Sequence, residues 1–265
     1  MSGPLRILAI VSSPTSPTDD PRAQARWASV LALARSEAAV LGVEDLADHA
    51  GYSPFHFSRL FTARYGLGPG RYLTALRIDA AKRMLLGDDA AVIDVATEVG
   101  FDSLSSFSRR FRDSVGVPPG ALRRLADRVA DVPPRPFALS PDAPAHQVSV
   151  HLELPAAFSS RGDASVWVGW YPHPAPIGLP RAGVLARGER TLHLPLCPGA
   201  PFLLGFAVPA QASVEEHLIP ADPVVAVHPA AVVPGDAVVL RFAPQGAMSP
   251  VPLLSALPVL CGSGA

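Results

Sequence analysis

The stretch LADHAGYSPFHFSRLFTARYGLGPG (residues 46–70) recurs as VATEVGFDSLSSFSRRFRDSVGVPPG (residues 95–120). Gly51 matches Gly100 at an offset of 49, and the positions beyond match at an offset of 50. One residue was therefore added in or just after the turn of the second copy. Each copy predicts a short helix, a glycine turn and a second helix, which is the helix-turn-helix pattern.

The start of the second helix in each copy can be predicted from its capping residues. In the first copy Ser53 stands where an N-cap is needed and Pro54 stands at the following position, which favours a helix start there. In the second copy either Asp102 or Ser103 can serve as the cap. Residues 71–86 form helix readily and predict a rigid connection between the two units.

Two helix-turn-helix units at a fixed separation favour DNA binding over simple packing. Successive major-groove faces on one side of B-DNA lie about 34 Å apart, and a connecting helix is a direct way to set that spacing. Arginine can contact guanine, serine can contact either kind of base edge, and an apolar side chain can meet a thymine methyl. The predicted base contacts are Phe55, Ser58 and Arg59 in the first unit and Leu104, Ser105, Ser108 and Arg109 in the second.

Basic and hydroxyl side chains in or near these helices supply candidates for the phosphate backbone. The strongest individual candidates for DNA contact are Arg59 and Arg109, because they occupy the same place in both copies among phenylalanines that face the core. The predicted phosphate contacts are Ser53, Arg64, Arg71, Arg77, Lys82, Ser103, Arg110 and Arg112.

Composition changes near residue 130 and predicts a second domain. Residues 22–130 carry 15 Lys/Arg and 12 Asp/Glu, whereas residues 131–265 carry 6 and 9, so a basic part precedes an acidic one. Of the 30 prolines, 22 lie after residue 130, where long helices become nearly impossible. The chain is therefore expected to be multidomain, with an all-α domain over residues 21–128.

The acidic part predicts an antiparallel β-sandwich over residues 146–265. Short apolar runs alternate there with Pro/Gly breaks, and runs such as VSVHLEL show the alternation of half-buried strands. Residues 129–145 are proline-rich and predict a semi-rigid linker, and residues 1–20 predict an N-terminal tail. A ligand-binding fold of mixed helix and sheet is the alternative for the second domain, which the lack of periodic helices disfavours.

Residues 25–124 resemble the AraC/XylS family of transcription regulators. The resemblance rests on LADHAGYSPFHFSRLF, GLGPGRYLTALRIDAAKRMLL and IDVATEVGFDSLSSFSRRFRDSVGVPPGALRR. It implies a seven-helix domain that inserts two recognition helices into adjacent major grooves and acts mostly as an activator, with RNA polymerase as a partner. The Leu-Ser-Ser sequence at residues 104–106 shortens the hydrogen-bonding reach of the second recognition helix and favours shape and phosphate readout there. The order is also unusual, because most members place the DNA-binding domain last.

The β-domain carries weaker functional signals. Its segment TLHLPLCPGAPFLLGFAVPA (residues 191–210) resembles a strand, turn and strand of carboxypeptidase-regulatory-like or transthyretin-like sandwiches. Aromatic residues with polar tips suit a small-molecule effector pocket, although in a strand they can equally be core. Dimerisation or polymerase contact without a ligand is the alternative. The residues of the possible pocket are Trp167, Trp170, Tyr171 and His173.

Several other classes are disfavoured. We expect no metal and no cofactor, since Cys197 and Cys261 have no paired spacing and no phosphate-binding or catalytic motif is present. No apolar run approaches the length that spans a bilayer, so a cytoplasmic protein without membrane contact is expected. The sequence thus predicts a DNA-binding regulator that is not an enzyme and is either a monomer or a homodimer. A protein-interaction adaptor with a degenerate helix-turn-helix module is the alternative.

Overall fold

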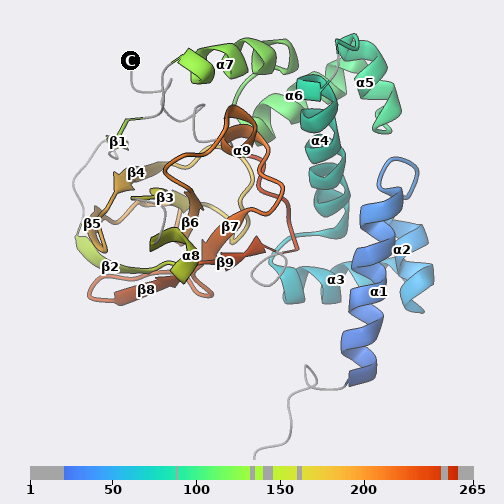
Figure 1. The fold of residues 1–265 in the computed structure, drawn as a ribbon. Helices are drawn as coiled ribbons and strands as arrows, with labels where there is room; N and C mark the ends of the chain where they lie inside the picture. Colours follow the sequence, from blue (N-terminus) through green and yellow to red (C-terminus); the bar gives the residue numbers. More distant parts are fainter. Residues whose placement is uncertain are drawn as a thin grey trace, which may run out of the picture.

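The N-terminal half of this computed structural model is helical (Figure 1). The structure describes residues 21–87, 89–131, 135–139, 146–159, 163–245 and 250–255, so the predicted tail over residues 1–20 lies outside the described residues. The helices of this half are α1 (Pro21–Glu37), α2 (Val43–Ala50), α3 (Pro54–Tyr65), α4 (Pro69–Gly87), α5 (Val92–Glu98), α6 (Leu104–Val115) and α7 (Pro119–Asp131).

The predicted repeat is present as the pairs α2–α3 and α5–α6. Each first helix is followed by a glycine in the left-handed region: Gly51, with φ of 73°, caps α2, and Gly100, with φ of 83°, comes directly after Val99, which caps α5. The extra residue of the second copy lengthens the segment between Gly100 and the start of α6. In each pair the residue after the glycine donates its N–H to a carbonyl of the preceding helix, which fixes the turn.

Serine N-caps begin both second helices, as predicted. Ser53 Oγ accepts from the backbone N–H of His56 at 3.4 Å, and Ser103 Oγ accepts from that of Ser106 at 3.3 Å. The cap of α6 is therefore Ser103 rather than Asp102. Each hydroxyl satisfies one of the N–H groups that a helix start leaves without an intrahelical partner.

The second helices bury their phenylalanines in a common helical core. Phe57 and Phe61 of α3 and Phe107 and Phe111 of α6 are all fully buried. Trp27 of α1 stacks on Phe57, with ring centroids 5.8 Å apart. Because this core holds the inner face of α3 and of α6, the opposite face of each helix is left to solvent.

The C-terminal half contains two β-sheets. One has the order β1-β4-β3-β6-β7-β9, and the other has the order β5-β2-β8. The pairs of the first sheet are antiparallel, but β2 and β8 run parallel, so the prediction of a wholly antiparallel fold is wrong at that pair. The strands are β1 (Phe137–Leu139), β2 (Gln147–Glu153), β3 (Ser165–Tyr171), β4 (Ala182–Arg187), β5 (Thr191–Pro195), β6 (Phe202–Val208), β7 (Val224–Val227), β8 (Ala237–Arg241) and β9 (Ala243–Pro244), with short helices α8 (Ala156–Ser159) and α9 (Val214–Leu218).

The two sheets share one hydrophobic core. Alternate residues of β2 are buried, and Val148 and Val150 pack in the same cluster as Val168 and Trp170 of β3. The larger sheet is buried on its other face too, where Trp167 stacks on Phe137 with ring centroids 5.7 Å apart. Strand β3 is therefore buried along its whole length, and its residues after Ser165 are mostly apolar.

The predicted linker over residues 129–145 is only partly a linker. Helix α7 extends to Asp131, and residues 137–139 form strand β1, which pairs with β4 so that Phe137 lies opposite Leu185. The proline-rich composition concealed this strand. Residues 132–134 and 140–145 lie outside the described residues.

The helical and β halves share a core. Ala175 and Ile177 from the β3–β4 loop, Leu218 of α9, and Val251 and Leu254 near the end of the described chain all pack in the helical cluster. Figure 1 shows α9 and α7 beside each other at the junction of the halves. The β half therefore completes the core of the helical half.

Candidate nucleic-acid interface

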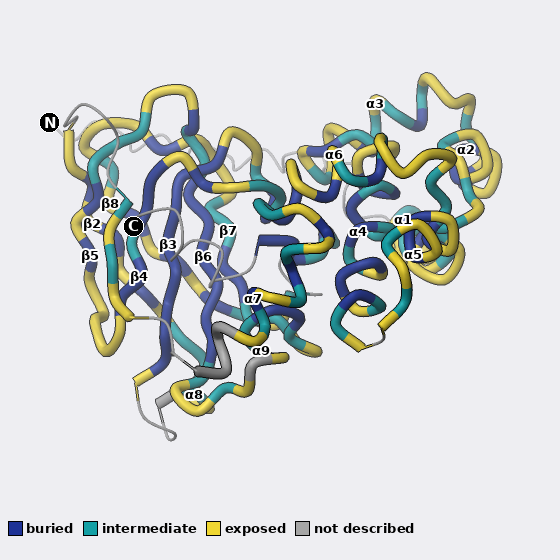
Figure 2. Tube along the Cα trace, turned by 90° about the horizontal axis from the view of Figure 1, so that it is seen from above, coloured by how far each residue is buried: buried dark blue, intermediate teal, exposed yellow. Residues whose placement is uncertain are grey.

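Helices α3 and α6 lie at opposite ends of α4 (Figure 1). Figure 2 shows that both also lie on one side of α4, where their outer turns are exposed. Because the two helices have the same caps and bury the same phenylalanine positions, equivalent residues of the repeat point outward from each. The helix-turn-helix fold thus presents two similar faces on one side of the molecule.

The predicted base-contacting side chains lie on these faces. Phe55 is 81% exposed and Leu104 is 41% exposed, so both apolar side chains are accessible to a partner. Arg59 and Arg109 are exposed at the equivalent positions of the two helices. The remaining predicted base contacts are Ser105, which is exposed, and Ser58 and Ser108, which are partly buried.

Neither Arg59 nor Arg109 forms an ion pair with any described residue. An arginine kept for structure is normally held by a carboxylate, a carbonyl oxygen or an aromatic ring. Arg110 and Arg112 of α6 are also exposed and form no ion pair within the described chain. The outer face of α6 therefore offers three guanidinium groups to an anionic partner.

Two further predicted phosphate contacts are exposed but have aromatic or imidazole neighbours. The guanidinium carbon of Arg64 lies 5.9 Å from the ring centroid of Trp27. Arg71 Nη1 donates to Nε2 of His173 at 3.1 Å, and burial, together with the charge of Arg71, lowers the pKa of this histidine. Ser53 and Ser103 are exposed as well, and their hydroxyl groups cap the two helices.

The prediction that Lys82 contacts phosphate is wrong. Its side chain is fully buried, and Nζ donates to the carbonyl oxygens of Leu253 at 3.2 Å and Leu254 at 3.0 Å. Burial lowers the pKa of Lys82 to about 8. The residue stands on the side of α4 that faces the β half, which its position in the sequence could not reveal.

The prediction that Arg77 contacts phosphate is also wrong. Its guanidinium donates from Nε to Ala38 O at 2.7 Å, from Nη2 to Leu41 O at 3.1 Å and from Nη1 to Gly100 O at 3.0 Å. The first two carbonyls belong to the loop before α2, and the third belongs to the turn of the second helix-turn-helix unit. Arg77 thus links the two units, and each of its three guanidinium nitrogens donates to a backbone carbonyl oxygen.

Glycine at position 100 allows the two units to meet. A Cβ atom there would lie 1.9 Å from the carbonyl oxygen of Ala39, which belongs to the loop before α2. At the equivalent Gly51 a Cβ would meet nothing within 4 Å. The turn of the second unit is therefore fixed against the first by backbone contact as well as by Arg77.

The β3–β4 loop reaches the C-terminal ends of both α3 and α6, a contact that the sequence did not reveal. Gly66 caps α3, and a Cβ on it would lie 2.5 Å from Cγ of Pro174. At α6, Gly178 donates its backbone N–H to the carbonyl oxygen of Ser114 at 2.9 Å. One loop of the β half therefore contacts both candidate recognition helices.

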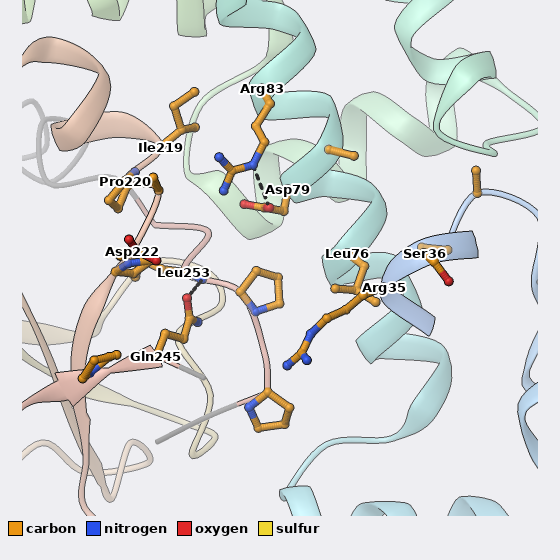
Figure 3. Close-up of a pocket in the computed structure, with 18 residues that line it drawn as sticks. Arg35, Ser36, Leu76, Asp79, Arg83, Ile219, Pro220, Asp222, Gln245 and Leu253 are labelled. Atoms are coloured by element: carbon orange, nitrogen blue, oxygen red, sulfur yellow. Dashed lines mark hydrogen bonds and ion pairs between the residues drawn. The ribbon is translucent and has the colours of Figure 1, made fainter. Parts of the chain in front are cut away.

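The predicted ligand pocket at residues 167–173 is wrong for its three large aromatic side chains. Trp167, Trp170 and Tyr171 are fully buried, and the two tryptophans fill the cores on the two faces of β3. His173 lies next to Arg71 at the junction of the halves. A cavity of about 610 Å³ lies elsewhere, between α1, α4 and the segments at residues 219–223, 244–245 and 250–253 (Figure 3).

Comparisons with known proteins agree with the helix-turn-helix geometry. A family described as "Helix-turn-helix domain" matches residues 46–125. The chain is 38% identical over 87 residues to the HTH-type transcriptional activator AarP of Providencia stuartii, covering 33% of this chain and 64% of the relative. It is 39% identical over 92 residues to a putative AraC-like transcription regulator of Streptomyces lividans, covering 35% and 30% respectively. Residues 46–125 therefore form an AraC-type helix-turn-helix domain.

A solved structure is similar over the same half. It is the DNA-binding domain of AdpA, described as a global transcriptional factor in complex with a target DNA. The two sequences are 33% identical, the match covers 41% of this chain and 96% of that chain, and the TM-score is 0.36. The chain spans 64% or less of the length of the two curated relatives above. In the described part of the chain, no helix is both long and apolar enough to cross a membrane.

Proposed function

We propose that the protein is a DNA-binding transcription regulator of the AraC type that inserts α3 and α6 into adjacent major grooves. The observation that carries this proposal is the equivalent placement of Arg59 and Arg109. Both are exposed, and neither forms an ion pair with any described residue. An arginine in this position on a recognition helix can bind guanine through two hydrogen bonds.

The joint between the two units supports simultaneous use of both helices. Arg77 and the close approach at Gly100 fix one unit against the other, so binding DNA with both costs little additional ordering. The exposed Arg64, Arg110 and Arg112 are proposed to contact phosphates. Activation of transcription through RNA polymerase remains an expectation from the family resemblance and from relatives such as AarP.

We also propose that the β half is a two-layer sandwich that serves effector sensing. Its two sheets share one apolar core, which supports the layered description. The contact of its β3–β4 loop with the ends of α3 and α6 gives a physical route from the β half to the DNA-binding face.

The test is selection of bound fragments from random DNA by the wild-type protein and by the variants Arg59→Ala and Arg109→Ala. The matched control is Arg241→Ala, which removes an exposed arginine of β8 that pairs with Glu153. We expect the wild type to enrich two sequence blocks about one helical turn apart, and each variant to lose a different block. Removal of one base-contacting arginine should weaken the free energy of binding to the preferred DNA sequence by about 1–3 kcal/mol.

Two results would contradict the proposal. If both arginine variants select the same DNA sequences as the wild type, α3 and α6 do not read the base sequence through these residues. No enriched sequence from the wild type, at low as well as moderate salt, would instead favour the protein-interaction adaptor.

A further inference from the structure

The cavity between the halves has rigid, mostly apolar walls. Five of its lining residues are prolines, whose rings fix the backbone torsion φ. Its volume of about 610 Å³ falls within the range of small-molecule sites, which often occur between domains. The prolines are Pro220, Pro223, Pro244, Pro250 and Pro252.

Two charged groups of the cavity lack a charged partner. Asp79 and Arg83 of α4 pair with each other, with Oδ2 and Nε 3.2 Å apart. By contrast, Arg35 at the end of α1 and Asp222 before β7 form no ion pair with any described residue. Figure 3 shows Arg35 and Asp222 on opposite sides of the cavity.

The neighbours of Arg35 do not neutralise it. The groups that interact with it electrostatically include the hydroxyls of Tyr65 and Tyr72. Burial raises the pKa of both phenols, so they remain uncharged at neutral pH. The cavity therefore has one positive and one negative group available, with apolar walls between them.

We propose that this cavity binds a small zwitterion whose charges lie at its two ends, of the class of a short apolar peptide with free termini. Its carboxylate would pair with Arg35 and its ammonium group with Asp222. Two other ligand classes fit the cavity less well. A simple organic anion would be repelled by Asp79 and Asp222, and a phosphate ester needs more positive charge than one unpaired arginine supplies. An extended chain of three residues reaches about 10 Å, which sets the scale of the ligand.

A ligand in this cavity would contact the joint between the helix-turn-helix units. Ala38 and Ala39 line the cavity, and their carbonyls contact Arg77 and Gly100 respectively. Leu253 lines it too, and its carbonyl accepts from the buried Lys82. Binding of a ligand in the cavity is therefore coupled to the relative placement of α3 and α6. A change in DNA affinity on ligand binding would follow, and this consequence rests on the proposed function.

The experiment is calorimetric titration of the full chain with trileucine, N-acetyl-trileucine and trileucine amide. The acetyl group removes the positive charge and the amide removes the negative one. We expect trileucine to bind most tightly and each blocked peptide to bind about fivefold more weakly, the upper range for an exposed ion pair.

Two variants assign each charge to its partner. In Arg35→Met the acid and the amide should bind equally, and in Asp222→Asn the free and the acetylated peptides should bind equally. Arg241→Met, which lies outside the cavity, should behave as the wild type. Equal binding of all three peptides to the wild type, unchanged preferences in the two variants, or no binding at millimolar peptide would each overturn the assignment.

DNA binding is measured separately, so that the two proposals can fail independently. Arg59→Ala and Arg109→Ala should retain trileucine binding while losing DNA specificity. Peptide binding in a protein that selects no DNA sequence would overturn the proposed function and leave the zwitterion site standing. Sequence-specific DNA binding without peptide binding would overturn the site alone.

Discussion

Lys82 Nζ lies 3.0 Å from the carbonyl oxygen of Leu254, although 172 residues separate the two in sequence. The lysine is fully buried, and besides this carbonyl it has that of Leu253 as an acceptor. A buried ammonium group held by neutral carbonyls is stabilised less than it is in water. The consequence is the lowered pKa of about 8.

The contribution of Lys82 to the free energy of unfolding should therefore rise with pH above about 8. This contribution is what remains after the pH dependence due to other titrating groups is subtracted. Between the folded pKa of Lys82 and its unfolded value of 10.5, the unfolded state binds more protons at this residue than the folded state does. The contribution to the free energy of unfolding should increase by up to about 1.4 kcal/mol per pH unit. Urea denaturation between pH 8 and about 9.5 measures it, because this range lies below the titration of ordinary tyrosines.

The control for this prediction is Lys82→Met, whose unbranched side chain is one atom shorter and carries no charge. Asp79 and Arg83 act on Lys82 electrostatically and are unchanged in the variant. The difference between the two pH profiles isolates Lys82 from groups such as Cys197, whose thiol pKa is raised by burial. Parallel profiles would show that Lys82 keeps its ordinary pKa.

Gly100→Ala should be far more damaging than Gly51→Ala. Both glycines have positive φ, so alanine costs about 1–2 kcal/mol at either position through backbone strain alone. At position 100 the new Cβ would also clash with the carbonyl oxygen of Ala39. We expect an additional loss of about 2 kcal/mol or more, measured by urea denaturation. Equal losses would mean that the contact between the two units gives way easily.

Arg77→Met should loosen the spacing of the two helix-turn-helix units. Three carbonyl oxygens would lose a charged donor, and we expect the free energy of unfolding to fall by about 2–4 kcal/mol. If the variant still folds with both α3 and α6 in place, the DNA fragments that it selects should show a wider range of spacings between the two sequence blocks. Destabilisation without any broadening of the spacing would assign Arg77 a role in folding only.

Substitutions at Ser103 can separate its role as a helix cap from contact with phosphate. Ser103→Ala removes the cap on α6 and should cost about 1 kcal/mol of stability. Ser103→Asp keeps a capping oxygen but places a negative charge at the N-terminal end of α6, which is proposed to face DNA. We expect the aspartate variant to be as stable as the wild type yet to bind DNA several-fold more weakly, as measured by fluorescence anisotropy. Unweakened DNA binding would place Ser103 away from the phosphates.

The local features of the helical half were predictable because they depend on residues close in sequence. Glycine turns, serine caps and the periodic phenylalanines fix α3 and α6 by short-range geometry. The same rules led to an error at Arg77 and Lys82, since a basic residue on an amphipathic helix is usually solvated. Their acceptors, such as Gly100 and Leu254, come from other parts of the chain.

The β half shows the same limit. Alternation predicted the buried face of β2, but β3 is buried on both faces, so its period does not distinguish core from pocket at Trp167 and Trp170. The parallel pairing of β2 with β8 joins segments far apart in the chain, which no local pattern reports. The cavity near Arg35 and Asp222 likewise exists only because the two halves pack together.

The shared core has a consequence for how the protein is made. Residues 21–131 leave the ribosome well before Leu218, Val251 and Leu254, which complete their core. Until then Lys82 lacks its two carbonyl acceptors and an apolar seam of the helical half remains uncovered. The two helices proposed to read DNA are thus expected to reach their final arrangement only after the β half has been synthesised, which would delay DNA binding until the chain is complete through Leu254.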